Sequence, residues 1–575
     1  MNVVAALVLV VVAVMAVADE APVANTLQGR VAGVKEESTK GRTFYSYHRI
    51  PFAKPPVGEL RLKDPVAGER WEGVLDGSTM PEPCLQIPFG ISVIGLPDVH
   101  VGREDCLYLN VFTPESAEEG SNLPVMVWIH GGGFFAGSTN EYLPHVLLNH
   151  DVVIVSIQYR LGIMGFLSTE DSVIPGNFGL KDQTLALQWV QRNIHNFGGD
   201  KTRVTIFGES AGGASVHYHI LSPKSEGLFS RAIMQSGSSL CPWAFTWSAA
   251  PVKDRVAEAF GCSTSEGSEA LLTCLQSLDA IQLALYASEL NDWFLFPIRL
   301  APRMDGDYLP EEPSQLVRKG RHQHVDIMTG VTANEGGLFT MPMYVRRELL
   351  DVFETNFSLV GPASLQCHED DHPTDVATQI YRRYLGELKF DETRSEDVLK
   401  AFSARHFFAG VDWAAMYHAR NQHPNKKVYT YELQHTGEMS LSDFFEKKDD
   451  KKWVVHGDDL FYLFWGGPIF DSKSTPKPLR DLQQEEDLAL RDIMTTLWTN
   501  FAETGNPTPD DSLGFTWEPS TEDNLQYLAL KLNPTMEADQ RQEMRRFHAS
   551  LPTKENFILH PDLVKAEPGG GREEL

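Results

Sequence analysis

At 575 residues, with 42% hydrophobic and 22% charged side chains, the chain has the composition of a folded globular protein with a large core. Its 78 acidic residues outnumber its 50 lysines and arginines, which gives a formal net charge of -28. This balance argues against nucleic acid and anionic membrane surfaces as partners, because both select clusters of positive charge.

The first eighteen residues predict a secretory signal peptide. Val3 to Met15 is an almost unbroken apolar run, and Ala16-Val17-Ala18 provides the small residues of a cleavage site. The alternative is a membrane anchor, for which the run is short. We therefore expect a signal peptide at 1–18, one domain at 19–565 without a membrane span, and a flexible tail at 566–575.

The predicted secretory route makes disulfides possible, because disulfides persist in oxidising compartments. Two cysteine pairs bracket short loops: Cys84 with Cys106, and Cys262 with Cys274. Spacing alone does not decide which cysteines pair. Cys241 and Cys367 would then be left over as buried thiols. Asn356-Phe357-Ser358 is a usable N-glycosylation sequon.

Short apolar runs alternate with helical patterns through the middle of the chain. Strands are expected at 124–129, 151–159, 204–207, 231–235, 325–330 and 428–433, and helices at 180–197 and 211–221. Apolar strands that alternate with helices predict the α/β class, with a mainly parallel sheet covered on both faces.

The motif GESAG at 208–212 directly follows one of these strands. A strand, a sharp turn with serine at its tip and a helix follow one another in the order of a nucleophile elbow. Gly208 and Gly212 flank the serine because a side chain there would collide with neighbouring backbone. Functional groups gather at the carboxyl ends of strands in such sheets, so Ser210 is predicted to be a nucleophile.

A serine nucleophile needs a base to remove its proton and an acid to orient that base. Glu335 lies just past the strand at 325–330, whereas Asp305 and Asp307 precede it and are typical of a turn. His456 follows an apolar tripeptide and is the favoured base, with His435 as the alternative. A histidine base predicts an apparent pKa near ~6 to 7.

The sequence HGGGF at 130–134 also follows a predicted strand. Acyl transfer builds negative charge on a carbonyl oxygen, which fixed backbone N–H groups stabilise strongly. Glycine lets the backbone approach such an oxygen without obstruction. Gly132, Gly133 and Ala211 are therefore the candidate donors.

With these motifs the chain resembles the type-B carboxylesterase and lipase family, which includes the cholinesterases. The resemblance rests on GRVAGVKE near 29, EDCLYLNVF at 104–112, NFGLKDQTLALQWVQRNIHNFGGD at 177–200, FGESAGG at 207–213 and HGDDLFYLF at 456–464. It implies an α/β-hydrolase fold that uses neither metal nor cofactor. The residues it implies are the triad Ser210, Glu335 and His456, the oxyanion hole Gly132, Gly133 and Ala211, the bridges Cys84–Cys106 and Cys262–Cys274, and structural ion pairs at Glu104 and Arg160.

Departures from relatives narrow the expected substrate. The first cysteine loop has no tryptophan to hold a quaternary ammonium, so choline esters are disfavoured. Glu209 and Gly213 differ from the Gln and Ala usual in juvenile hormone esterases, which leaves hormone hydrolysis as an alternative. Five aromatic residues are similar to the family's pocket wall, with core packing as the other interpretation: Phe134, Phe135, Trp293, Phe294 and Phe296.

We therefore expect a serine carboxylesterase that acts on small-molecule esters with hydrophobic, uncharged acyl and alcohol groups. A catalytically silent binding protein of the neuroligin type is the rival from another class. The C-terminal REEL follows three glycines and resembles the KDEL and HDEL retrieval signals. It predicts the endoplasmic reticulum lumen and a retrieval receptor as partner, with secretion as the alternative.

Overall fold

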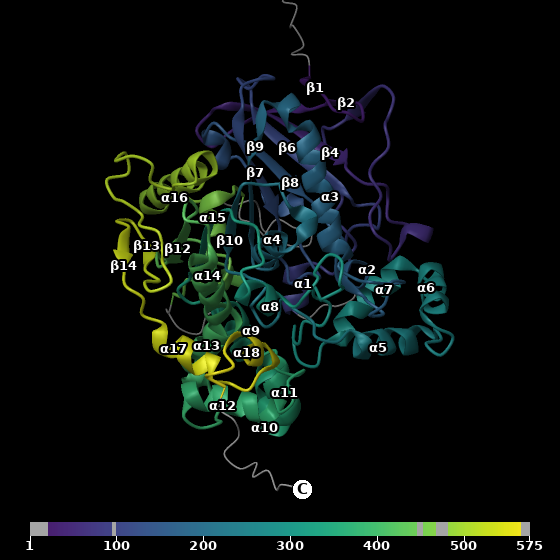
Figure 1. The fold of residues 1–575 in the computed structure, drawn as a ribbon, viewed down its shortest axis with the longest axis vertical. Coiled ribbons are helices and arrows are strands. Elements are labelled where there is room, and N and C mark those ends of the chain that lie inside the picture. Colours follow the sequence, from purple (N-terminus) through teal and green to yellow (C-terminus); the bar gives the residue numbers. More distant parts are fainter. Residues whose placement is uncertain (1–20, 95–98, 445–451, 467–480, 565–575) are drawn as a thin grey trace, which may run out of the picture.

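Within the residues that the structure describes, a sheet of eleven strands runs through the middle of the protein (Figure 1). Its strands lie in the order β14-β13-β12-β11-β10-β9-β7-β8-β6-β4-β3. The strands from β8 to β13 pair in parallel, and the strands toward both edges pair antiparallel. Their bounds are β3 (Val34–Glu37), β4 (Thr43–Pro51), β6 (Tyr108–Pro114), β7 (Leu123–Ile129), β8 (Val153–Ile157), β9 (Gly199–Glu209), β10 (Arg231–Gln235), β11 (Asp326–Thr332), β12 (Val428–Leu433), β13 (Tyr527–Leu530) and β14 (Thr535–Glu537).

The structure is a computed structural model that describes residues 21–94, 99–444, 452–466 and 481–564. The predicted signal peptide and the REEL tail lie outside these residues. A small second sheet joins β1 (Val23–Asn25), β2 (Arg30–Ala32) and β5 (Val74–Asp76). The helices are α1 (Phe89–Ile94), α2 (Gly162–Phe166), α3 (Phe178–Asn193), α4 (Ala211–Leu221), α5 (Ala250–Phe260), α6 (Ser268–Ser277), α7 (Ala280–Tyr286), α8 (Pro313–Arg318), α9 (Gly337–Val345), α10 (Arg347–Thr355), α11 (Phe357–Ser364), α12 (Pro373–Leu385), α13 (Ser395–Ser403), α14 (Ala409–Asn421), α15 (Leu460–Leu463), α16 (Glu485–Thr504), α17 (Gln542–Ala549) and α18 (Lys554–Leu559).

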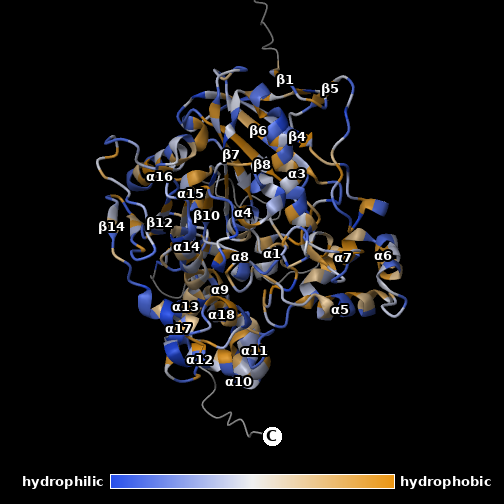
Figure 2. Ribbon diagram, in the orientation of Figure 1, coloured by the Kyte–Doolittle hydropathy of each residue, from blue (hydrophilic) through white to orange (hydrophobic). Residues whose placement is uncertain are grey.

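The central strands are buried on both faces. Every residue of β8 and of β11 is buried, although successive side chains of a strand point to opposite faces. Figure 2 shows hydrophobic colour where β6, β7 and β8 are labelled. Helices α3, α4, α14 and α16 pack against the sheet. The α/β-hydrolase fold class is therefore confirmed, and the predictions at 211–221, 231–235 and 428–433 have the bounds of α4, β10 and β12.

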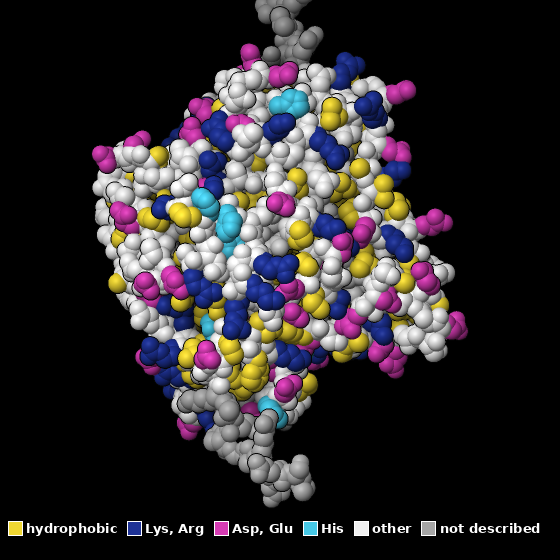
Figure 3. Space-filling view, viewed as in Figure 1, with side chains coloured by type: hydrophobic (Ala, Val, Ile, Leu, Met, Phe, Trp, Pro, Cys, Tyr) yellow, Lys and Arg dark blue, Asp and Glu magenta, His cyan; other side chains and the backbone are white. Residues whose placement is uncertain are grey.

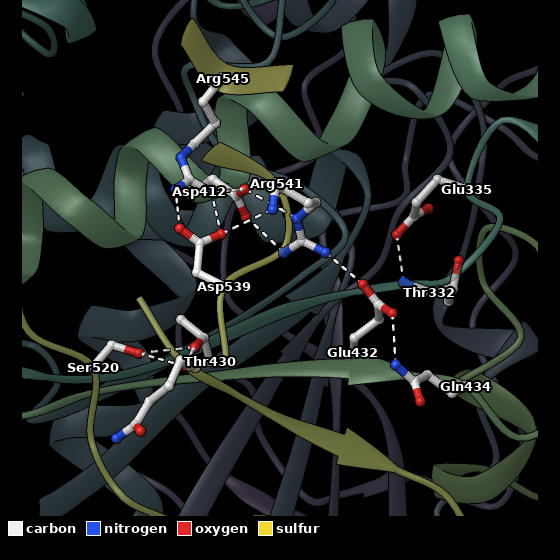
Figure 4. A network of polar contacts seen from close by, with 11 residues as sticks. Thr332, Glu335, Asp412, Thr430, Glu432, Gln434, Ser520, Asp539, Arg541 and Arg545 are labelled. Carbon is white, nitrogen blue, oxygen red and sulfur yellow. Dashed lines mark hydrogen bonds and ion pairs between the residues drawn. The ribbon is translucent and has the colours of Figure 1, made fainter. Parts of the chain in front are cut away.

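A network of charged side chains connects α14 and α17 to strand β12 (Figure 4). Arg541, just before α17, pairs with Asp412 on α14 at 2.8 Å and also with Glu432 on β12. Arg545 on α17 pairs with Asp412 and Asp539. Because these partners come from separate elements, the network fixes how α14 and α17 sit beside β12.

Both cysteine pairs implied by the family resemblance form disulfides, Cys84 with Cys106 and Cys262 with Cys274. Cys241 and Cys367 are free and buried, as predicted. The first bridge closes the loop that carries α1. This helix therefore stays beside the carboxyl edge of the sheet.

The surface seen in Figure 3 carries acidic and basic side chains interspersed with one another. Among the described residues, no single helix is long and apolar enough to cross a bilayer. One pair of helices, α6 with the segment Ala280–Leu290, passes that test only when joined across a bend of 111°.

Two ion pairs lie at the positions that the family resemblance implied. Glu104 pairs with Arg61 at 2.6 Å. Arg160 pairs with Asp182 at 2.7 Å, and Asp182 also accepts the backbone N–H of Arg160. Both members of the second pair are buried. They link α3 to the segment after β8.

Replacing Asp182 by Asn should destabilise the fold strongly, because Arg160 would remain buried without its counter-ion. Breaking a buried pair costs roughly 3–5 kcal/mol. The exposed pair Arg42–Asp151 provides the control, since the loss of an exposed pair costs about 0–1 kcal/mol. Urea unfolding of Asp182→Asn and Asp151→Asn measures the difference. Equal losses for the two variants would contradict a structural role for the buried pair.

Candidate active site

Parallel pairing aligns the carboxyl ends of four neighbouring strands. Ile129 at the end of β7 lies opposite Gly208 on β9, and Gln235 at the end of β10 lies opposite Glu209. The β10 and β11 pair continues this register. The residues that directly follow these ends therefore meet at one edge of the sheet, where ligands bind in such folds.

Ser210 occupies the sharp turn between β9 and α4. Its backbone has φ 57° and ψ -122°, a conformation that costs a non-glycine residue roughly 1–3 kcal/mol. The turn is close-packed, because a Cβ at Gly212 would lie 2.1 Å from the carbonyl oxygen of Ile129. The backbone N–H of Ser210 donates to Gln235 O at 2.8 Å. The surrounding sheet therefore holds the strained serine at the edge where the strands end.

The glycine turn after β7 lies against this serine. Gly131, Gly132 and Gly133 all line the cavity that contains Ser210. Gly132 has φ 104°, and a Cβ there would lie 2.1 Å from Ala136 O. Only glycine therefore fits this close turn. Ala211 is the first residue of α4, and free N–H groups at a helix start favour negative charge.

Glu335 and His456 lie on two loops that are hydrogen-bonded to each other, which brings the two side chains together. His456 Nδ1 lies 2.7 Å from Glu335 Oε2. The other carboxylate oxygen, Oε1, accepts the Ser236 hydroxyl at 2.6 Å. It also accepts the Thr332 N–H at 2.8 Å (Figure 4). Asn334 donates its N–H to Val454 O at 2.8 Å, which joins the two loops. Glu335 is thus fixed on one oxygen and bonded to the imidazole with the other.

The competing residues lie elsewhere. His435 contacts Asp487 at 2.7 Å and does not line the cavity around Ser210. Asp305 accepts backbone N–H groups of the residues that follow it, including Tyr308 and Leu309, so it forms a turn. In the described part of the chain, no group of three or more His, Cys, Asp or Glu is arranged to hold a metal ion.

A second carboxylate, which the sequence analysis did not assign, lies on the other side of the imidazole. Glu209 Oε1 is 3.0 Å from His456 Nε2, and both side chains are buried. Burial by itself lowers the pKa of His456, but the negative charges of Glu209 and Glu335 outweigh it and raise the pKa to about 10. Two carboxylates beside the imidazole therefore favour a pKa above the ~6 to 7 expected for a histidine base.

The cavity at this edge has a mostly apolar wall. The ring of Phe407 lies over the His456 imidazole, with 4.4 Å between their centroids. A second cavity adjoins the first through Phe135, Leu295 and Ile298, which line both. The two cavities therefore share part of their walls.

The five candidate aromatic residues divide between the cavities and the core. Phe135 and Phe296 line the cavity with Ser210, and Phe294 lines the second cavity. Phe134 is fully buried against Phe166, and Trp293 donates its indole N–H to Leu349 O at 3.0 Å. For Phe134 and Trp293, core packing is the interpretation that fits. Wall residues that the sequence analysis did not name are Phe89, Trp243, Leu338, Phe339, Phe407 and Leu441.

Comparison with known proteins agrees with this geometry. Residues 20–548 match the description "Carboxylesterase family". The chain belongs to the carboxylesterase family. Similar proteins are a juvenile hormone esterase of Tribolium castaneum, 36% identical across 86% of this chain and 85% of its own length, and the pyrethroid hydrolase Ces2a of Mus musculus, 36% identical across 93% and 92%. Esterase FE4 of Myzus persicae is 34% identical across 86% of both chains. This carboxylesterase is a carboxylic ester hydrolase.

Replacing Glu209 by Gln in this carboxylesterase should shift the acid limb of the kcat/KM profile to lower pH. The carboxylate stabilises the imidazolium form of His456, so its removal lowers the pKa of the base. An opposite charge at this distance shifts a pKa by roughly 1 to 3 units. The profile of a neutral chromogenic ester between pH 5 and 10 measures the shift.

Glu82→Gln is the matched control for this shift, because Glu82 is exposed and pairs with Arg103. Its profile should overlay that of the wild type. An acid limb of Glu209→Gln that stays in place, or moves to higher pH, would contradict the assigned effect of Glu209.

Proposed function

We propose that this carboxylesterase hydrolyses esters through an acyl-enzyme on Ser210. His456 accepts the proton of the Ser210 hydroxyl, and the serine oxygen then attacks the ester carbonyl. Glu335 orients the imidazole and stabilises the imidazolium that forms. The 2.7 Å contact between His456 Nδ1 and Glu335 carries this proposal, because it orients the imidazole in the cavity that Ser210 also lines.

The tetrahedral intermediate requires donors for its oxyanion. We assign this role to the backbone N–H groups of Gly132, Gly133 and Ala211, which belong to the glycine turn and the start of α4. The imidazolium returns its proton to the departing alcohol, and the carbonyl re-forms as the acyl-enzyme. His456 then activates water for attack on the acyl group, which releases the acid and restores Ser210.

Replacing Ser210 by Ala should lower the turnover of a chromogenic acetate ester on the order of 10⁴ to 10⁶-fold, since only binding and oxyanion stabilisation remain. The loss should appear in kcat, and an organophosphate should label Ser210 in the wild type alone. A variant that kept the wild-type rate would overturn the assignment of the nucleophile. It would also revive the catalytically silent rival, a neuroligin-like binding protein.

The preferred substrates are small-molecule esters with hydrophobic, uncharged groups. The wall of the catalytic cavity supports this, because rings such as Phe135, Phe296 and Phe339 dominate it. Relatives of equal identity carry different names, juvenile hormone esterase and pyrethroid hydrolase among them. Their names therefore do not favour one ester over another, and hormone hydrolysis stays an alternative of the same reaction class.

We also propose that the protein enters the secretory pathway and is retained in the endoplasmic reticulum lumen. The apolar N-terminus supports entry, and the two disulfides fit an oxidising compartment. Asn356 is exposed at the start of α11, which suits glycosylation. The C-terminal REEL would bind a retrieval receptor, and secretion is the alternative.

Deletion of residues 572–575 should send the protein from the cells into the medium, because a retrieval receptor reads a free C-terminal tetrapeptide. Esterase activity in medium and lysate, each normalised to total activity, measures the redistribution. Replacement of REEL by KDEL is the control and should keep the protein inside. Equal secretion of the wild type and the deletion would contradict retention by REEL.

A further inference from the structure

One carboxylate in the catalytic cavity takes no part in the proposed hydrolysis. Glu141 ends the short 3-10 helix η2 (Thr139–Glu141), which follows the glycine turn of the oxyanion hole. Its side chain lines the same cavity as Ser210 and His456, and part of it remains accessible. A substrate bound at Ser210 would therefore share the cavity with Glu141.

The surroundings of Glu141 neutralise little of its charge. The Ser138 hydroxyl hydrogen-bonds to the carboxylate, and the nearby rings are those of Tyr142 and Tyr159. Tyr159 donates its own proton to His130 O at 2.8 Å, and His130 stacks on that ring. Among the described residues, no ion pair joins Glu141 to Lys, Arg or His.

The other charged groups of the cavity balance one another in part. Glu209 lies at 3.0 Å and Glu335 at 2.7 Å from the imidazole of His456. The positive charge of the protonated imidazole offsets part of the negative charge of these two carboxylates. The described cavity lining contains no Lys and no Arg. Glu141 therefore adds a negative charge to an apolar cavity whose described lining has no cationic side chain besides His456, and His456 already lies between two carboxylates. In such surroundings charges interact more strongly than in water.

We propose that Glu141 determines the charge selectivity of this esterase and discriminates against esters whose alcohol group is negatively charged. This inference rests on the proposed function, because it places the substrate at Ser210. Glu141 repels an anionic group in the cavity and attracts a cationic one. Uncharged esters are affected least.

The discrimination should depend on pH near neutrality. Burial raises the pKa of Glu141 to about 7, although the Ser138 hydroxyl opposes the rise. The carboxyl is therefore mostly neutral at pH 6 and mostly charged at pH 8. Selectivity against anions should grow over this interval. The titration of His456 cancels when two substrates are compared as a ratio at the same pH, since both need the same base.

The experiment compares two near-isosteric substrates, neutral 4-acetoxybenzamide and anionic 4-acetoxybenzoate, through the ratio of their kcat/KM values. For the wild type, this ratio should rise from pH 6 to pH 8 on the order of tenfold, as expected for like charges in a partly buried site. For Glu141→Gln, it should stay flat and close to the wild-type ratio at pH 6. Glu141→Asp keeps the charge and should retain most of the rise.

A second pair of substrates tests whether the effect of Glu141 reverses with the sign of the substrate charge. The pair is 4-(trimethylammonio)phenyl acetate and its uncharged isostere 4-tert-butylphenyl acetate. Glu141→Gln should weaken the preference for the cation while it relaxes discrimination against the anion. If it moves both charged esters in the same direction, or leaves both ratios unchanged, the inference is wrong. Such a result does not affect the proposal that Ser210 hydrolyses esters. An active Ser210→Ala variant, in contrast, would contradict the proposed function itself. Turnover of 4-tert-butylphenyl acetate reports that each variant is folded.

Discussion

The proposed catalytic site depends on one imidazole held between two carboxylates. His456 contacts Glu335 on one ring nitrogen and Glu209 on the other, all of them buried. Two negative charges in a protein interior cost free energy unless a positive charge or hydrogen bonds compensate them. The imidazolium supplies that compensation, and Ser236 and Thr332 supply hydrogen bonds to Glu335. His456 is therefore a stronger base than an isolated histidine. For the same reason, its protonated form loses the proton less readily.

The sheet provides the precision that this arrangement requires. Glu209 ends one strand and Ser210 directly follows it, Ser236 follows the next strand, and Glu335 lies past the third. Since these strands pair in parallel and in register, their ends cannot move independently. His456 alone comes from a distant loop, and Asn334 joins that loop to the one with Glu335. Strain at Ser210 persists because the neighbouring strands fix the turn.

Much of this was predictable from local sequence. The strands at β10 and β12 and the helix α4 have the predicted bounds, because apolar runs between turn residues were unambiguous there. The antiparallel edges, such as β3 and β14, were not predicted, since short half-exposed strands leave a weak pattern. Ser210 was evident from its motif, whereas Glu335 and His456 needed the family resemblance, because 19 histidines make chain order a poor guide.

Residues that act through tertiary contact were harder to find. Glu209 sits beside the serine in sequence, yet nothing local indicates that its side chain turns toward His456. Phe407 lies nearly fifty residues before the imidazole that it covers. Phe134 and Trp293 illustrate the converse error, since an aromatic residue next to a site in sequence can still point into the core. The orientation of a side chain, and not its residue type, decides whether it lines the site.

The bridge between Cys84 and Cys106 has a consequence for where the enzyme can be made. The loop that it closes carries Phe89, whose ring stacks on Phe135 in the cavity that Ser210 also lines. One wall of the cavity thus depends on a covalent bond that thiol-reducing surroundings break. Chains produced in a reducing cytosol would have the same sheet and the same serine, but the cavity wall that includes Phe89 would be less firmly held.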